Sequence, residues 1–155
     1  MPDSEWDEML AASLREVLET MFFTCVYGPA QPGGSSAVPR MAARLSFEGT
    51  PSGALSLSVP EPAVRALAAN FLAREPDDPL PSSQLGCVVC ELANMICGSL
   101  LSRVKTEEHF RLSNPELLPA GAACPPGPPT QSLAVEEGLG GAAIDLWLVL
   151  EHHVM

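Results

Sequence analysis

The stretch that decides the fold runs from Ser82 to Val104 and reads SSQLGCVVCELANMICGSLLSRV. Its apolar residues recur at the 3.6-residue period of a helix. They are Val89, Leu92, Ala93, Ile96, Leu100 and Val104. Ser82 or Ser83 is expected to cap the first turn, and Arg103 and Lys105 suit the negative end of the helix dipole. The pattern predicts a helix with one buried side.

The other side of this predicted helix is polar. Glu91, Asn94, Gly98 and Ser102 share it, so a carboxylate and a carboxamide lie one turn apart beside a glycine. Glycine inside a helix costs about 1 kcal/mol relative to alanine, and is tolerated where a backbone must come close to another group. Two interpretations remain open on spacing alone. Gly98 could fit a crowded helix crossing beside ordinary solvated polar residues, or this face could be a functional site.

The rest of the chain alternates helical and strand patterns. Helices are expected at about 3–23, 60–74 and 82–104, and strands at about 41–48, 54–59, 110–112, 132–136 and 142–153. This order predicts an α+β fold in which an antiparallel sheet of about five strands packs against three helices. A single domain spanning 1–155 is expected, with mobile Gly/Pro-rich loops at about 29–40 and 115–131. The sequence shows no internal repeat.

Two of these elements carry further expectations. The first helix has an apolar side and places Glu19 on its polar side. That apolar side comprises Trp6, Met9, Leu10, Leu14, Val17 and Met21. In the last strand Ile144 and Leu146 face one way, whereas Asp145 and Trp147 face the other. Trp147 therefore suggests a further contact surface, such as a homodimer interface.

Composition excludes several classes of function. The net charge of −11 argues against nucleic-acid binding and disfavours docking on anionic lipid. The start of the chain is acidic, where a secretion signal would be basic, and we expect no apolar run long enough to span a membrane. The best candidate for such a run, Leu139 to Leu150, is interrupted by Asp145. A cytoplasmic protein without nucleic-acid or membrane partners is expected.

The cysteines raise a redox or metal alternative. There are five, at Cys25, Cys87, Cys90, Cys97 and Cys124. Cys87-x-x-Cys90 lies inside a predicted helix, whereas a redox pair normally begins one, and no second pair of ligands has the spacing of a zinc site. We therefore expect reduced thiols, no metal site and no cofactor-binding site.

A self-contained enzyme is not apparent. The chain has no phosphate-binding glycine loop and no G-x-S-x-G nucleophile motif. Helping another protein to hydrolyse its phosphoryl group requires less, because that reaction is mostly positioning and charge stabilisation. The carboxamide of Asn94 could orient a water, and the carboxylate of Glu91 could pair with a partner's lysine.

The motif Glu91-Leu92-Ala93-Asn94-Met95-Ile96-Cys97-Gly98 resembles the E-x-x-N-x-x-x-G motif of the CheC/CheX/FliY phosphatases of bacterial chemotaxis. Leu14 to Phe22 resembles the opening helix of that family. Arg111 to Glu116, with Gly121, resembles the segment that follows its central helix. In the two-site CheC branch the first helix carries a second E-x-x-N, and here that asparagine position is Phe22. The chain is therefore most similar to the CheX branch, with one site.

The resemblance implies roles for two residues of the motif. Asn94 would orient the water that attacks the aspartyl phosphate of a CheY-like response regulator. Glu91 would form a salt bridge to the regulator's lysine. Because glycine has no side chain, we also expect Gly98 to allow close approach of the helix. The regulator would supply Mg²⁺, and a homodimer is possible. A non-catalytic adaptor for a regulator or motor component is the alternative, and a thiol redox or metal protein is a third.

Overall fold

The computed structural model describes residues 3–29, 39–49, 51–75, 79–104, 109–119, 128–135 and 143–151. Within these ranges the helices are α1 (Asp3–Met21), α2 (Glu61–Phe71) and α3 (Ser82–Ser102). The strands are β1 (Val26–Pro29), β2 (Arg40–Glu48), β3 (Ser52–Pro60), β4 (Arg111–Leu112), β5 (Glu116–Leu117), β6 (Gln131–Val135) and β7 (Ala143–Glu151). All strand pairs are antiparallel, which confirms the predicted α+β class.

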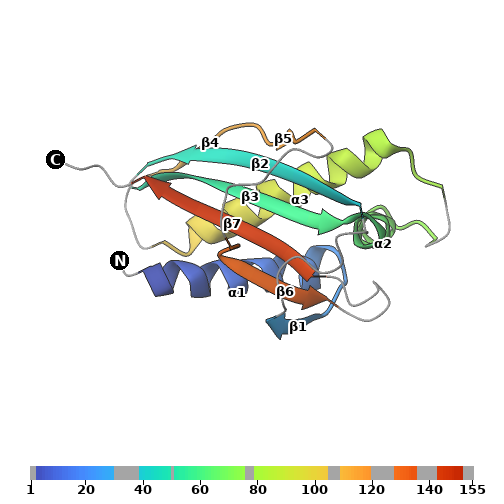
Figure 1. Cartoon of the computed structure of the whole chain (residues 1–155), viewed down its shortest axis with the longest axis horizontal. Helices are drawn as coiled ribbons and strands as arrows, with labels where there is room; N and C mark the ends of the chain where they lie inside the picture. Colours follow the sequence, from blue (N-terminus) through green and yellow to red (C-terminus); the bar gives the residue numbers. More distant parts are fainter. Residues whose placement is uncertain are drawn as a thin grey trace.

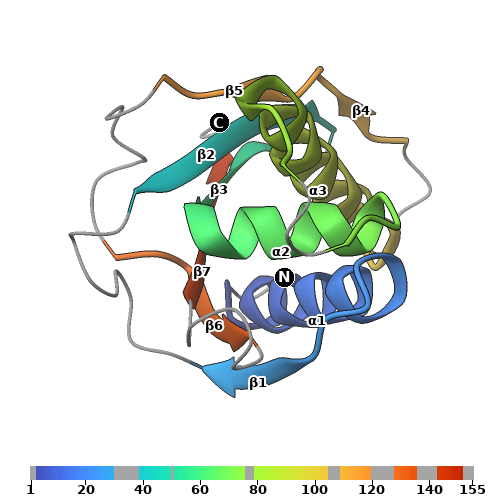
Figure 2. The same cartoon turned by 90° about the vertical axis from the view of Figure 1, so that its right-hand side faces the viewer.

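The elements form two layers. The sheet covers one side of the molecule, and α1 and α3 pack beside each other on the other side (Figures 1 and 2). Figure 2 shows the sheet curving around these helices, with α2 lying across one end of the layer. One face of α3 is therefore in the core while the opposite face is left outside the fold.

The order of the strands is β1-β6-β7-β3-β2-β4, with β5 also paired to β2. The first half of the chain, α1 to β3, corresponds to the second half, α3 to β7. In this correspondence β1 matches β4, β2 matches β6 and β3 matches β7. Exchanging the matched strands gives the same order, read from the opposite edge of the sheet. The fold is therefore an internal duplication around the central β3–β7 pair. The sequence does not show this duplication, because the two halves share topology and not residues.

The core lies between the sheet and the helices. The apolar stripe of α3 is buried as predicted, except that Val104 is only partly buried. In β2 and β3 every second residue faces the helices, beginning at Ala43 and Leu55. Phe22 is fully buried and stacks on Phe71 at 4.8 Å between ring centroids. This contact joins the ends of α1 and α2.

Two expectations about the helix ends and faces are wrong. Neither Ser82 nor Ser83 caps α3, because Pro81 occupies the N-cap position and its carbonyl accepts bonds from the backbone of Gln84 and Leu85. Met21, assigned to the apolar side of the first helix, is 45% exposed. The chain leaves the helix there, so the next residue, Phe22, is the one that turns into the core.

The strand count also changes. β1 and β5 were not expected, and β5 lies inside the stretch 115–131 that was assigned to a loop. Ala43 pairs with Leu117 and Arg44 with Glu116, so this part of the segment forms the edge of the sheet. Two-residue strands carry too little pattern to be found by alternation. Residues 30–38 and 120–127, in the two predicted loops, lie outside the described residues.

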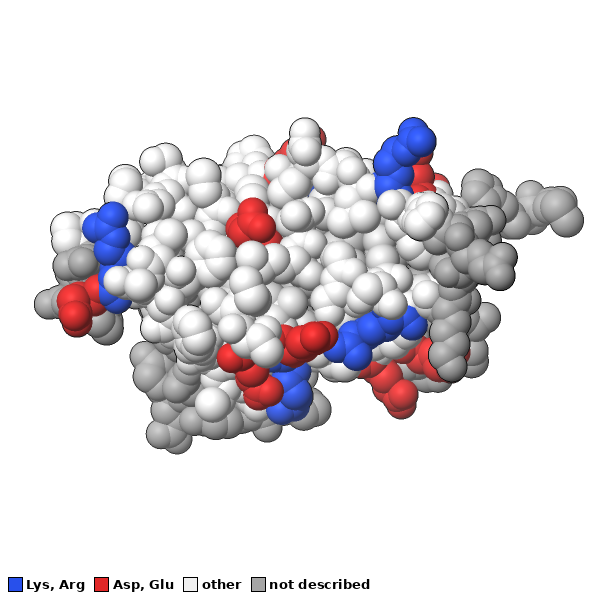
Figure 3. Space-filling model, turned by 180° about the vertical axis from the view of Figure 1, so that it is seen from behind, with Lys and Arg blue, Asp and Glu red and all other residues white. Residues whose placement is uncertain are grey.

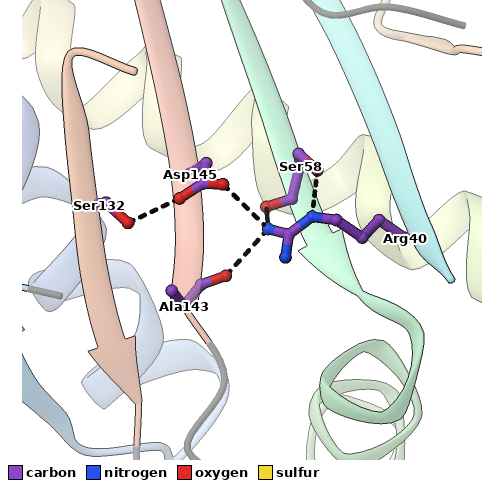
Figure 4. Close-up of polar contacts among 5 residues, drawn as sticks. All are labelled: Arg40, Ser58, Ser132, Ala143 and Asp145. Carbon is purple, nitrogen blue, oxygen red and sulfur yellow. Dashed lines mark hydrogen bonds and ion pairs between the residues drawn. The ribbon is translucent and has the colours of Figure 1, made fainter. Parts of the chain in front are cut away.

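A buried polar network holds the side of the sheet that faces away from the helices (Figure 4). Asp145 is 3% exposed, pairs with Arg40 at 3.3 Å and accepts a 2.6 Å bond from Ser132. Arg40 also donates to the Ser58 hydroxyl at 2.8 Å and to the Ala143 carbonyl at 2.9 Å. The network ties β2, β3, β6 and β7 together. The sequence placed Asp145 on the second face of its strand, as an interruption of an apolar run, and did not predict its burial.

One further expectation needs correction. By length and composition α3 is apolar enough to cross a membrane, contrary to the prediction that no such run exists. In the fold, 56% of its apolar window is buried inside the protein, as in the core helix of a globular domain.

Candidate functional site on the outer face of α3

The motif residues lie where the helical pattern places them. Glu91 and Gly98 are exposed and Asn94 is half-buried, all on the side of α3 opposite its buried stripe. Three residues of helix separate the two polar side chains by about 4.5 Å along the axis. A carboxylate and a carboxamide therefore face outward together, one turn apart.

Neither polar side chain is used by the fold. Among the residues that the structure describes, Glu91 and Asn94 make no side-chain hydrogen bond or ion pair. The half-buried carboxamide of Asn94 can both donate and accept hydrogen bonds. The pair is available to a group outside the chain.

Gly98 has open space around it. Among the residues that the structure describes, a Cβ built at this position would meet nothing within 4 Å apart from the helix itself and its chain neighbours. The crowded-crossing interpretation is therefore wrong. The glycine leaves the outer face of α3 low at the turn after Asn94, which permits another molecule to approach the helix backbone.

On one side this face is bordered by α1. Glu16 of α1 accepts a hydrogen bond from Ser99 at 3.1 Å and pairs with Arg103 just beyond α3. Arg103 also donates to the buried hydroxyl of Ser13 at 3.1 Å. These contacts fix the two helices against each other and neutralise the basic group nearest the end of α3. Glu91 is then the only ionisable carboxylate within α3 itself.

On the other side the face is bordered by β5. The side chain of Leu117 rests on Gly86, where an added Cβ would lie 2.8 Å from Leu117 Cδ2. Leu117 is nevertheless 45% exposed. The sequence pattern singled out neither Gly86 nor Leu117. A glycine on the buried side of a helix was the available signal, since its absent side chain must leave room for a neighbour.

Two of the thiols of α3, those of Cys90 and Cys97, have pKa values raised by their surroundings. Burial raises the pKa of Cys97 to about 12. Burial and the neighbouring Cys87 thiol raise the pKa of Cys90. Both shifts favour the unreactive thiol over the thiolate. Within the described ranges no three metal-ligating side chains gather, and Cys124 lies outside them.

The first helix presents no equivalent pair. Glu19 is exposed, but Phe22 at the expected asparagine position is buried. The pocket formed by described residues lies elsewhere. A small polar pocket lined by Arg44, Ser46 and Glu116 lies at the sheet edge and includes no residue of α3. The outer face of α3 is an open surface with few charged groups, seen from behind in Figure 3.

Comparison with known proteins identifies the family. The family described as chemotaxis phosphatase CheX matches residues 41–123, which include the whole of α3. The chain belongs to the CheX family. This confirms the resemblance to the CheX branch drawn from the motif. No curated protein sequence matches the chain.

Solved structures share the fold over nearly the whole chain. CheX from Vibrio vulnificus is 18% identical, with a TM-score of 0.70 and coverage of 97% of this chain and 99% of that one. CheX from Desulfovibrio desulfuricans is 17% identical, with a TM-score of 0.69 and coverage of 95% and 99%. A chain of the Borrelia burgdorferi CheX–CheY–BeF3–Mg complex is 16% identical, with a TM-score of 0.69 and coverage of 94% and 97%. At these identities the likeness is one of fold.

Proposed function

We propose that this CheX-family protein accelerates hydrolysis of the aspartyl phosphate of a CheY-like response regulator and so terminates a chemotaxis or other two-component signal. One observation carries the proposal: Glu91 and Asn94 stand outward, one turn apart and without partners among the described residues, on a helix that the family match includes. This function requires that the protein act in the cytoplasm of a bacterium.

Asn94 performs the chemical task in this proposal. Its amide oxygen accepts a hydrogen bond from a water, and its NH₂ donates to a phosphoryl oxygen or a group beside it. The water is thereby held in line with the bond from phosphorus to the aspartyl oxygen. The regulator's own Mg²⁺ and lysine stabilise the charge of the transferred group. This chain adds positioning and no cofactor.

Glu91 performs the docking task. Its carboxylate pairs with the lysine of the regulator's active site, one turn from the amide that holds the water. Because α3 bears no other ionisable carboxylate, this single pair sets the register of the helix on the regulator. Gly98 allows the two backbones to come close. A homodimer is compatible with this arrangement, because Glu91, Asn94 and Gly98 all come from one chain and the site needs no residue from a second copy.

The test is regulator dephosphorylation. Response regulators from the same genome are phosphorylated with acetyl phosphate, catalytic amounts of the protein are added, and phosphate decay is followed. Removing one well-placed hydrogen-bonding group in an active site typically lowers turnover by about 10²–10³-fold. Asn94→Ala is therefore expected to abolish most of the acceleration without loss of the fold.

Gln84→Ala is the matched control, since Gln84 is a second half-buried carboxamide on α3, ten residues before Asn94. It should retain most of the activity. Acceleration that persists in Asn94→Ala would contradict the assigned role. Binding of a phosphorylated regulator without faster decay would instead establish the non-catalytic adaptor.

A further inference from the structure

Leu117 is an apolar side chain whose exposure the fold itself maintains. It is 45% exposed and lies outside the hydrophobic core, although it sits on the helix-facing side of the sheet opposite the buried Ala43. Gly86, on the buried side of α3, is the residue beneath it. A glycine inside a helix lowers helix stability by about 1 kcal/mol relative to alanine. Here the glycine makes room for a leucine that remains half exposed to solvent.

The backbone around Leu117 is fixed in place. Leu117 pairs with Ala43, Glu116 pairs with Arg44, and the amide of Leu118 donates to the Ala42 carbonyl at 2.8 Å. Pro115 and Pro119 stand on either side of this short strand and restrict its dihedral angles. The leucine is therefore preorganised, which lowers the conformational entropy lost when a partner covers it.

Leu117 also lies beside the candidate site. On the helical wheel Gly86 lies between the buried stripe and Asn94, whereas Ser99 and α1 lie toward the Glu91 side. Eight residues of helix place the Gly86 position about 12 Å from Asn94 along the axis. The half-exposed Cys90 lies between them. A molecule seated on Glu91 and Asn94 would extend over Leu117.

We propose that Leu117, seated over Gly86, is a docking residue that contacts an apolar side chain of the phosphorylated response regulator, displaced from the aspartyl phosphate by about 12 Å along the axis of α3. The inference rests on the proposed function and deepens it. The surface over α3 bears few charges (Figure 3), and α3 itself offers one carboxylate for steering. Selection among regulators with the same active-site lysine must then come from neighbouring contacts, and a fixed apolar side chain favours regulators without a charge at that place.

The experiment separates docking from turnover. The probes are receiver domains of the same genome activated with beryllofluoride and Mg²⁺ for binding, and the acetyl-phosphate-treated regulators for kinetics. Leu117→Ser is expected to weaken binding and to raise KM by about tenfold, the effect of losing one well-packed interface side chain, while kcat changes by less than about twofold. Asn94→Ala should show the opposite split, with kcat lost.

Val149→Ser is the matched control. Val149 is 49% exposed on the side of the sheet that faces away from the helices, so its replacement should leave affinity for the receiver unchanged. Gly86→Ala is a second, independent variant. The new Cβ would displace the flexible end of Leu117, so the fold is kept while binding weakens by about threefold, and the effect vanishes when Leu117 is already serine.

The outcomes distinguish this inference from the proposed function. If the protein accelerates dephosphorylation and the variants Leu117→Ser and Val149→Ser bind the activated receiver with equal affinity, the docking role is overturned and the phosphatase proposal stands. If the wild-type protein does not accelerate dephosphorylation, but Leu117→Ser binds the activated receiver more weakly than the wild type does, the docking role is supported and the phosphatase proposal is overturned. A protein that binds none of the activated receivers would overturn both.

Discussion

The helices α1 and α3 occupy equivalent places in the duplicated sheet but serve different ends. α3 continues for two turns past Asn94, so its outer face carries Glu91, Asn94 and Gly98 together. α1 ends at Met21, and the residue at the asparagine position, Phe22, turns inward to stack on Phe71. Extending or ending a helix at this point decides whether the position faces a partner or the core. One half of the molecule therefore holds the candidate site while the other half strengthens the fold.

The largest effect is expected from forcing α1 to imitate α3. Phe22→Asn restores the E-x-x-N spacing with Glu19 but replaces a fully buried ring, so the free energy of unfolding should fall by about 3 kcal/mol. Urea unfolding measures this loss. Phe23→Asn is the control, because Phe23 is 72% exposed at φ +52°, a conformation that asparagine tolerates better. A Phe22→Asn protein as stable as the wild type, with doubled phosphatase activity, would break the comparison.

The two glutamates give the second test. Glu91→Ala should lower kcat/KM for the phosphorylated regulator by about a hundredfold, because the regulator's lysine loses its charged partner in a desolvated contact. Glu19 is also exposed, on α1, and Glu19→Ala should change neither kcat/KM nor stability measurably. Equal losses in the two variants would mean that both helices dock, and undiminished binding by Glu91→Ala would remove its salt bridge.

A smaller effect concerns the buried side of α3. With Glu19 placed on Glu91, Cys25 falls on Cys97, but Cys25 lies beyond the end of α1 and is exposed. The pKa of Cys97 rises from 9.0 to about 12, so its contribution to stability is complete below pH 9 and is lost as the pH rises toward 12. Between pH 8 and pH 10 the loss should be about 1.4 kcal/mol.

Chemical unfolding at the two pH values measures this loss. Cys97→Ala should remove that part of the pH dependence, whereas Cys25→Ala should retain it. The same alkaline loss in both variants would show that the Cys97 thiol is not protected by burial.

The smallest effect belongs to Gly98. Because a Cβ meets nothing there, Gly98→Ala should raise the free energy of unfolding by about 0.5–1 kcal/mol, as expected for an exposed helix interior. Its regulator affinity should fall while stability rises, which thermal unfolding and receiver titration together would show. A Gly98→Ala protein less stable than the wild type would support the interpretation that Gly98 fits a crowded helix crossing.

The sequence predicts the parts of the fold that repeat a pattern. The stripe from Val89 to Leu100, the β2–β3 hairpin and the outward position of Glu91 follow from periodicity alone. What it misses depends on single contacts across the chain. Pro81 displaces the serines as N-cap through backbone bonds, and β5 exists because its two residues pair with β2. The burial of Asp145 likewise depends on Arg40, 105 residues away.

The exchangeable halves have a consequence for how the chain can be connected. The start of α1 and the end of β7 lie at the same end of the molecule (Figure 1). A circularly permuted chain that opens at the link before α3 and joins the present ends would run α3 to β7 and then α1 to α2. The strand order would be retained with the site helix now first. Because the two halves can be exchanged without changing the strand order, either half could come first in the chain and give the same sheet.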